Sequence, residues 1–126
     1  MDMLPTIKAR TEITAYARSL GFDLVSFTKA AVDQKYRDAF QEWRAMKYEG
    51  GMSYMSDTAK VEQRLDMTKI LPGANSVIVV AMNYYRPQPP LKRGHGRVAR
   101  YAYGRDYHKI IGSKLRELAS LAKTLC

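Results

Sequence analysis

Cysteine is nearly absent from this chain, which has one, Cys126, among 126 residues. An internal disulfide needs two cysteines, and a zinc or iron–sulfur site built from thiolates needs several at defined spacing. The sequence therefore excludes both from the chain's own cysteines. We expect no metal ligands in the chain, and any cluster that the function uses must have its ligands elsewhere.

Long apolar runs are also missing. The longest, Val77–Met82, is far shorter than the roughly 18 residues that a membrane-spanning helix requires. The first twenty residues are interrupted by charges and lack the uninterrupted apolar stretch and cleavage site of a secretory leader. We therefore expect a cytoplasmic protein with no membrane partner.

Acidic residues are scarce in the second half. Residues 1–66 carry ten basic and ten acidic side chains, whereas residues 67–126 carry eleven basic side chains and only Asp106 and Glu117 as acids. The whole net charge of +9 thus lies in the second half. Such a field attracts polyanions, which favours RNA, DNA or a phosphate-bearing cofactor as partners. A solvated basic face that only aids solubility is an equally acceptable interpretation.

The pattern of apolar residues predicts alternating helices and strands. Periodic spacing predicts helices over Thr6–Leu20, Asp33–Tyr48 and Asp106–Leu125, and β-prone runs predict strands over Phe22–Phe27 and Ser76–Met82. With 46% hydrophobic residues, residues 1–126 can close one core, so we expect one domain. The fold class is α/β in the broad sense, a mixed α+β domain with a small mixed sheet flanked by helices.

Several finer expectations follow from composition. Ser76–Met82 is nearly all apolar and should be a central strand buried on both faces. The second helix carries a stripe that we expect in the core, consisting of Tyr36, Ala39, Phe40, Trp43 and Met46. Residues 51–66 should form a short helix and a surface excursion, Leu71–Ala74 a turn and Arg86–Gly96 a loop. Further strands would have to come from residues 97–103 or from sequence beyond residue 126.

Cations and aromatic rings alternate between Gly96 and His108. Three arginines and three tyrosines fall within eleven residues there. Guanidinium groups bind phosphates and stack on flat rings, and tyrosine offers both a ring face and a hydroxyl. The segment suits a large, planar, partly anionic ligand or unstacked nucleotides. An edge strand with a basic solvent face remains an alternative.

Asp106, Tyr107 and His108 stand together at the start of the last predicted helix. They gather three groups capable of proton transfer at one helix terminus, beside the rings and guanidinium groups. Asp106 is also the standard type of helix N-cap, and a lone histidine in a first turn is often a plain surface residue. The chain has no glycine-rich phosphate loop, paired-histidine zinc motif or nucleophile elbow.

Four segments resemble the amino-terminal region of epoxyqueuosine reductases. They are Gly51–Met55, Leu71–Ala74, Asn83–Tyr85 followed by Pro87, and above all Gly96–His108. The resemblance covers nearly the whole chain. It implies a tRNA-modifying oxidoreductase that performs the last step of queuosine biosynthesis, reducing epoxyqueuosine to queuosine at the tRNA wobble position. It also implies cobalamin and two 4Fe-4S clusters as cofactors, and a fold like that of reductive dehalogenases.

By motif position, the resemblance places Asp106, Tyr107 and His108 as catalytic residues lining the pocket near cobalamin and the modified base. Arg100, Tyr101 and Arg105 are implied to hold the cofactor or the tRNA backbone. The family continues into a strand with a catalytic aspartate and a ferredoxin-like domain with the cluster cysteines, which this chain lacks. We therefore expect a truncated amino-terminal domain that is inactive alone and needs a redox partner for the missing cluster domain. The alternatives are a stand-alone basic module that binds tRNA or cobalamin without redox activity, and a nonfunctional remnant.

Overall fold

A computed structural model describes residues 6–125 of the chain. The contacts between these residues divide them into two compact units. Unit 1 comprises residues 27–77, and unit 2 comprises residues 6–26 together with residues 78–125. No helix in the described part of the chain is both long and apolar enough to cross a membrane.

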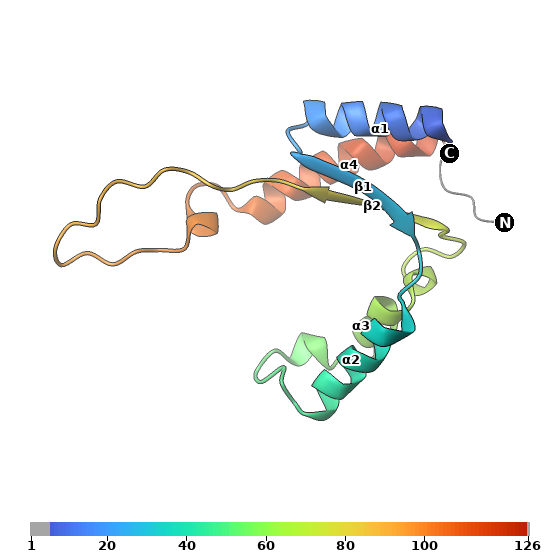
Figure 1. The fold of residues 1–126 in the computed structure, drawn as a ribbon, viewed down its shortest axis with the longest axis horizontal. Helices are drawn as coiled ribbons and strands as arrows, with labels where there is room; N and C mark the ends of the chain where they lie inside the picture. The colour runs from blue at the N-terminus through green and yellow to red at the C-terminus, as the bar shows by residue number, and fades with distance from the viewer. Residues whose placement is uncertain (1–5, 126) are drawn as a thin grey trace. The chain divides into compact units, whose positions relative to one another are not determined.

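The sheet has two antiparallel strands, β1 (Leu24–Lys29) and β2 (Ser76–Ala81), whose arrows run in opposite directions in Figure 1. Backbone hydrogen bonds flank the pair at both ends. The Asp23 N–H donates to the Ala81 carbonyl at 2.9 Å, and the Ala30 N–H donates to the Asn75 carbonyl at 3.1 Å. With four α-helices in the described residues, this confirms the mixed α+β class.

The expectation that residues 76–82 form a central strand buried on both faces is wrong for the described chain. Strand β2 is only half-buried, and Val79 is 50% exposed. The physical reason is that β2 pairs with one strand only. The segment 97–103 does not add a strand, because Arg100–Ala102 forms a 3-10 helix, η3.

Unit 2 is built on two helices that pack side by side, α1 (Ile7–Ser19) and α4 (Tyr107–Leu125), as Figure 1 shows. Both match the predicted helices. The buried apolar side chains of α1 recur every four residues, at Ala9, Ile13 and Ala17. Phe22, which follows α1, and Leu118 of α4 are also buried. Apolar area removed from water stabilises by about 25 cal/mol per Å², so this seam fixes α4 on α1.

Helix α1 ends in a Schellman motif. The Gly21 N–H donates to the Arg18 carbonyl at 2.9 Å, and the Phe22 N–H donates to the Ala17 carbonyl at 3.1 Å. Gly21 has a φ of 91°, which glycine adopts without a steric penalty. The Lys114 ammonium of α4 donates to the Leu20 carbonyl and so ties this helix end to α4.

Unit 1 holds α2 (Gln34–Ala45) and α3 (Thr58–Leu65), with the 3-10 helices η1 (Ser53–Met55) and η2 (Met67–Lys69). The Asp57 carboxylate caps α3 by accepting from the Lys60 N–H at 3.0 Å. Val61 is the buried apolar side chain of this unit. The predicted turn at Leu71–Ala74 is confirmed, since the Ala74 N–H donates to the Leu71 carbonyl at 3.1 Å.

The prediction of a core stripe on α2 is largely wrong. No residue of α2 is buried, and Tyr36 and Met46 are 59% and 58% exposed. Phe40 and Trp43 are half-buried and stack on each other with ring centroids 5.9 Å apart. Met46 leaves the stripe because the helix ends at Ala45, before the predicted Tyr48. It ends there because Lys47 adopts a left-handed conformation with a φ of 55°.

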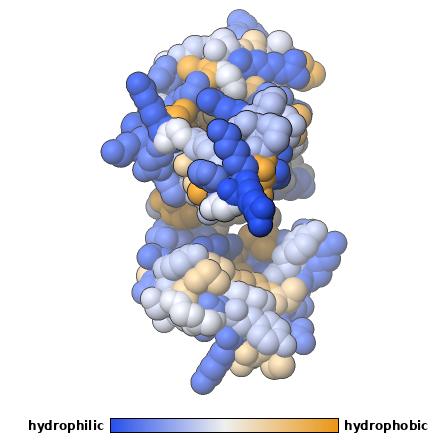
Figure 2. Space-filling model, turned by 90° about the vertical axis from the view of Figure 1, so that its left-hand side faces the viewer, coloured by the Kyte–Doolittle hydropathy of each residue, from blue (hydrophilic) through white to orange (hydrophobic). Residues whose placement is uncertain are grey.

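Residues 82–99 contain neither helix nor strand, which confirms the predicted loop over Arg86–Gly96. Figure 1 draws them as the long excursion between β2 and α4. Prolines fix φ and lack the N–H that a helix or ladder requires. Figure 2, in which this loop faces the viewer, shows mostly hydrophilic side chains on that face.

Candidate functional site

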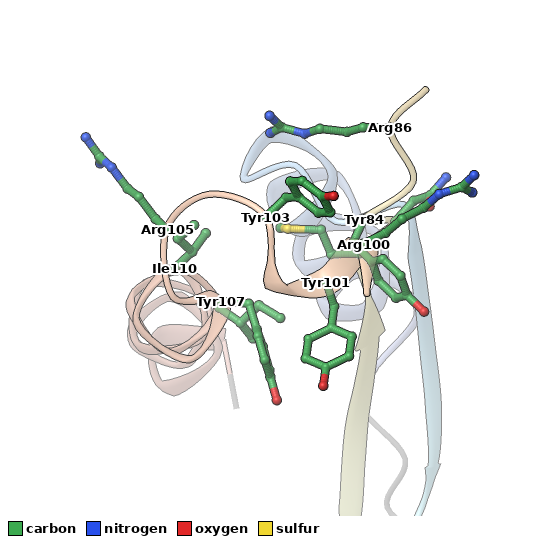
Figure 3. Close-up of a pocket in the computed structure, with 11 residues that line it drawn as sticks. Tyr84, Arg86, Arg100, Tyr101, Tyr103, Arg105, Tyr107 and Ile110 are labelled. Atoms are coloured by element: carbon green, nitrogen blue, oxygen red, sulfur yellow. The ribbon is translucent and has the colours of Figure 1, made fainter. Parts of the chain in front are cut away.

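Unit 2 contains a cavity of about 460 Å³ between the end of β2 and the start of α4. Figure 3 shows side chains from three places in the sequence converging there: the residues after β2, the η3 segment and the first turns of α4. The lining residues are Met82, Asn83, Tyr84, Arg86, Arg100, Tyr101, Tyr103, Arg105, Tyr107, Ile110 and Ile111.

The residues after β2 are held by short polar contacts. The Asn83 N–H donates to the Asp23 carboxylate at 2.6 Å, which ties the end of β2 to the residue before β1. The Asn83 side-chain oxygen then accepts from the Tyr85 N–H at 2.8 Å, a local turn typical of asparagine. These contacts fix where Tyr84 and Tyr85 leave the sheet.

A chain of aromatic contacts forms one wall of the cavity. Tyr84 meets Tyr101 edge-on at 6.5 Å between ring centroids, and Tyr101 meets Tyr107 edge-on at 6.2 Å. Tyr107 in turn stacks on the His108 ring at 4.0 Å. Each aromatic pair is worth about 0.5–1.5 kcal/mol beyond its buried area, so the rings support one another in fixed orientations. Figure 3 shows Tyr101 and Tyr107 side by side.

Three arginines add positive charge to this wall. The Arg100 guanidinium lies over the Tyr85 ring at 4.4 Å, a cation–π contact. In Figure 3 the Arg105 side chain extends away from the rings, and the Arg86 side chain passes above the Tyr103 ring in this view. None of the three has a carboxylate partner among residues 6–125. They are therefore available to phosphate or carboxylate groups of a ligand.

Asp106 and His108 form a pair at the N-terminus of α4. One oxygen of the Asp106 carboxylate accepts from the His108 N–H at 3.0 Å and lies 2.9 Å from the His108 Nδ1. The hydrogen bond from the His108 side chain, followed by that from its backbone N–H, lowers the pKa of Asp106 below the usual 3.8. Asp106 thus caps the helix and also orients the imidazole. The capping interpretation of Asp106 is confirmed.

The predicted site residues divide into two groups. Arg100, Tyr101, Arg105 and Tyr107 line the cavity, whereas Asp106 and His108 do not and reach it only through the stack on Tyr107. The lining residues Met82, Asn83, Tyr84, Arg86, Ile110 and Ile111 were not predicted as site residues, and Tyr103 was predicted only as part of the Gly96–His108 segment. The Asn83–Tyr85 motif was a signal for two of these positions, Asn83 and Tyr84, because it was one of the segments that resemble a known family.

These features define a class of protein. An α+β fold presents a cavity with a wall of fixed aromatic rings and unpaired guanidinium groups beside an Asp–His pair. Flat rings and bidentate cations suit a large ligand that has planar and anionic parts, such as a nucleotide or a nucleotide-bearing cofactor. Within residues 6–125, no three His, Cys, Asp or Glu side chains gather as metal ligands, and Cys126 lies outside the described residues.

Comparisons with known proteins narrow this class. A family model described as "Epoxyqueuosine reductase QueG, DUF1730" matches residues 64–126, half of the chain. The epoxyqueuosine reductase of Gloeobacter violaceus is 41% identical over 118 residues, which are 93% of this chain and 35% of the relative. That of Leadbetterella byssophila is 36% identical over 107 residues, covering 85% and 34%.

A solved structure agrees with these relatives. The crystal structure of an epoxyqueuosine reductase with an epoxyqueuosine-modified tRNA-Tyr stem loop matches with a TM-score of 0.78 and 25% identity, covering 93% of this chain and 32% of that chain. The chain belongs to the epoxyqueuosine reductase family. It spans about a third of the length of the curated relatives that it matches.

Proposed function

We propose that residues 1–126 form the amino-terminal domain of a cytoplasmic reductase that converts epoxyqueuosine to queuosine at the tRNA wobble position. The observation that carries the proposal is the cavity of unit 2, whose rings and guanidinium groups come largely from the Arg100–Tyr107 segment of a chain in this family. In this proposal the chain contributes binding and orientation to the active site, and other residues of the reductase complete it.

The tRNA would bind through the basic second half of the chain. A solved relative carries an epoxyqueuosine-modified stem loop, which supports the same class of ligand here. RNA bases in loops can be splayed out and stacked on aromatic side chains, as Tyr101 and Tyr84 would allow. The unpaired Arg86 and Arg105 side chains would contact phosphates and position the strand.

The residues of the cavity fit part of a cobalamin molecule. The cavity volume of about 460 Å³ lies within the roughly 300–1,000 Å³ range of small-molecule sites. The edge-to-face tyrosines offer flat apolar surface to a planar ring system, and Arg100 offers donors to amide or phosphate groups. When bound, cobalamin would supply the reducing cobalt centre that opening of the epoxide requires.

The Asp106–His108 pair, which adjoins the cavity through Tyr107 and does not line it, would supply the proton. Reductive removal of the epoxide oxygen takes two electrons and two protons and releases the oxygen as water, and a positioned acid accelerates protonation of the departing oxygen. Because Nδ1 of His108 faces the Asp106 carboxylate, Nε2 is the ring nitrogen available to exchange a proton. Tyr107 lines the cavity and stacks on this ring, so its hydroxyl would orient the substrate oxygen.

The described residues do not fit a 4Fe-4S cluster, since they contain no group of metal-ligating side chains. Clusters of this kind are held by several cysteine thiolates. The family resemblance implies such clusters, and in the proposed reductase a redox partner domain would hold them. A second candidate function is a binding module for tRNA or cobalamin without redox activity, which the concentration of the +9 charge in one half favours.

Cobalamin binding to the purified chain tests the cofactor part of the proposal. Visible absorption and calorimetry would compare the natural chain with an Arg100→Ala, Tyr107→Ala double variant. A Lys123→Ala variant, at an exposed position of α4 outside the cavity lining, is the charge control. We expect the double variant to lose affinity and the control to keep it. Equal affinities of all three would overturn the assignment of the cavity.

Nucleoside analysis of tRNA tests the reaction. The full-length gene would be expressed in cells that lack their own epoxyqueuosine reductase, and digested tRNA would be analysed by mass spectrometry. We expect queuosine to replace epoxyqueuosine, with less conversion for His108→Ala than for Lys123→Ala. Persistence of epoxyqueuosine with the natural, folded protein would favour the binding module instead.

A further inference from the structure

Unit 2 has a second, smaller cavity of about 210 Å³ within the loop that follows β2. Pro89, Pro90 and Leu91 give it an apolar side, and Lys92 and Arg97 give it a cationic side. The volume is below the roughly 300 Å³ at which pockets for drug-sized molecules begin. The cavity therefore suits one small group with a flat apolar part and an anionic part, and not a second large cofactor.

A turn begins at Lys92, one of the two cations of this cavity. The His95 N–H donates to the Lys92 carbonyl at 3.1 Å, and Gly94 provides the required positive φ of 82°. Lys92 and Arg97 are exposed and have no carboxylate partner among residues 6–125. No acidic residue occurs between Arg86 and Arg105, so nothing nearby in the sequence neutralises them.

Tyr103 connects the two cavities, because its side chain belongs to the lining of both. In the view of Figure 3, Tyr103 lies between the Arg86 side chain above it and Tyr101 below it. A ligand that extends past Tyr103 would place neighbouring parts of itself in the two cavities. A nucleic acid strand could do this, because each of its nucleotides carries a flat base and a phosphate.

We propose that the smaller cavity is a subsite for the nucleotide adjacent to the modified one in a single-stranded RNA loop. Its base packs against the prolines, Leu91 and Tyr103, and its phosphate contacts Lys92 and Arg97. The inference rests on the proposed function, which supplies RNA as the ligand. Single-stranded RNA fits better than an acidic peptide, since the apolar side of the cavity would pack poorly on carboxylate side chains whereas every base has a flat face.

Salt-dependent binding of an epoxyqueuosine-containing anticodon hairpin tests the phosphate contacts. The full-length protein would carry Lys92→Ala with Arg97→Ala, or the control pair Arg116→Ala with Lys123→Ala, which removes equal charge from exposed positions of α4. Each phosphate contact in a single strand contributes about 0.7 to the slope of log K against log salt. Because both cations contact one phosphate, we expect the loop pair to lower the slope by about 0.7 and the control pair to leave it unchanged.

Fluorescence tests the base contact. With 2-aminopurine in place of each nucleotide flanking the modified one, binding should quench the probe at one of the two positions. Quenching should persist in Tyr103→Phe and be lost in Tyr103→Ala, with matched thermal melts showing that both variants are folded. A peptide site would leave both readouts unaffected, which would refute the subsite.

The two proposals fail in different ways. Equal salt slopes for the loop and control pairs, in a protein that still binds the hairpin and reduces epoxyqueuosine, would refute the subsite alone. Failure of the natural protein to bind the hairpin and to reduce epoxyqueuosine would refute the proposed function and the subsite with it.

Discussion

Replacing Gly21 with alanine should destabilise unit 2 at the end of α1. Gly21 has a φ of 91°, and an L-residue in a left-handed conformation costs about 1–2 kcal/mol. An ideal Cβ at this position would lie 3.4 Å from the Lys114 Nζ and so would touch the ammonium that donates to the Leu20 carbonyl. We expect a loss of about 1–2 kcal/mol from the backbone alone.

Urea denaturation followed by circular dichroism would measure this loss. Gly96→Ala is the matched control in the same unit, because Gly96 has no positive φ and no heavy atom within 4 Å of an added Cβ. The control should change stability by less than about 0.5 kcal/mol. Gly21→Asn should fall between the two, since asparagine tolerates left-handed backbone. Equal stabilities of Gly21→Ala and Gly96→Ala would refute the reasoning.

Four further predictions follow from single contacts. The pKa of Asp106 is lower in the folded chain than its usual 3.8. The stability that the Asp106 carboxylate contributes is therefore fully present above pH 3.8 and is lost as the pH falls through the pKa of the folded state. A carbon-detected NMR titration should show this midpoint below 3.8, and His108→Ala should raise it. Asp57→Ala should cost about 1 kcal/mol by removing the cap of α3, and Asp57→Asn much less, both measured in urea. Leu118→Ala should cost about 2–5 kcal/mol, because the side chain is only 3% exposed; a melt equal to that of the natural chain would contradict this. Tyr101→Ala should weaken cobalamin binding about 2- to 10-fold in calorimetry through loss of aromatic contacts, with Tyr101→Phe unaffected.

The helices of unit 2 were predictable because their sequence signals are local. Apolar residues spaced three and four apart define α4, and Gly21 marks the end of α1. The loop after β2 was predictable for the same reason, since prolines act on their own residue and its neighbour. Such features need no knowledge of the tertiary contacts.

Burial was harder to predict than secondary structure. An apolar run such as Ser76–Met82 indicates a strand, but its burial depends on how many strands and helices cover it, and β2 has one partner strand. The burial of the stripe on α2 was hard to predict for the same reason. That helix also ends early, because Lys47 adopts the left-handed conformation that glycine favours, and a lysine in the sequence does not predict this conformation.

The site was half predictable. Arg100, Tyr101, Arg105 and Tyr107 are close in sequence, so their clustering was visible as a motif. Tyr84 joins them because β2 ends beside the start of α4, and this proximity depends on the tertiary structure and is not visible in the sequence. The same holds for Asp23, whose contact with Asn83 spans 60 residues of sequence.

The stacked Phe40–Trp43 pair has a practical consequence for optical spectroscopy. Trp43 is the chain's one tryptophan and belongs to unit 1, whereas the cavity tyrosines belong to unit 2. Tryptophan emission during denaturation therefore follows the melting of unit 1, while far-ultraviolet dichroism also follows α1 and α4. Coincident transitions would mean that residues 1–126 unfold as one cooperative domain, and separate transitions would give each unit a stability of its own.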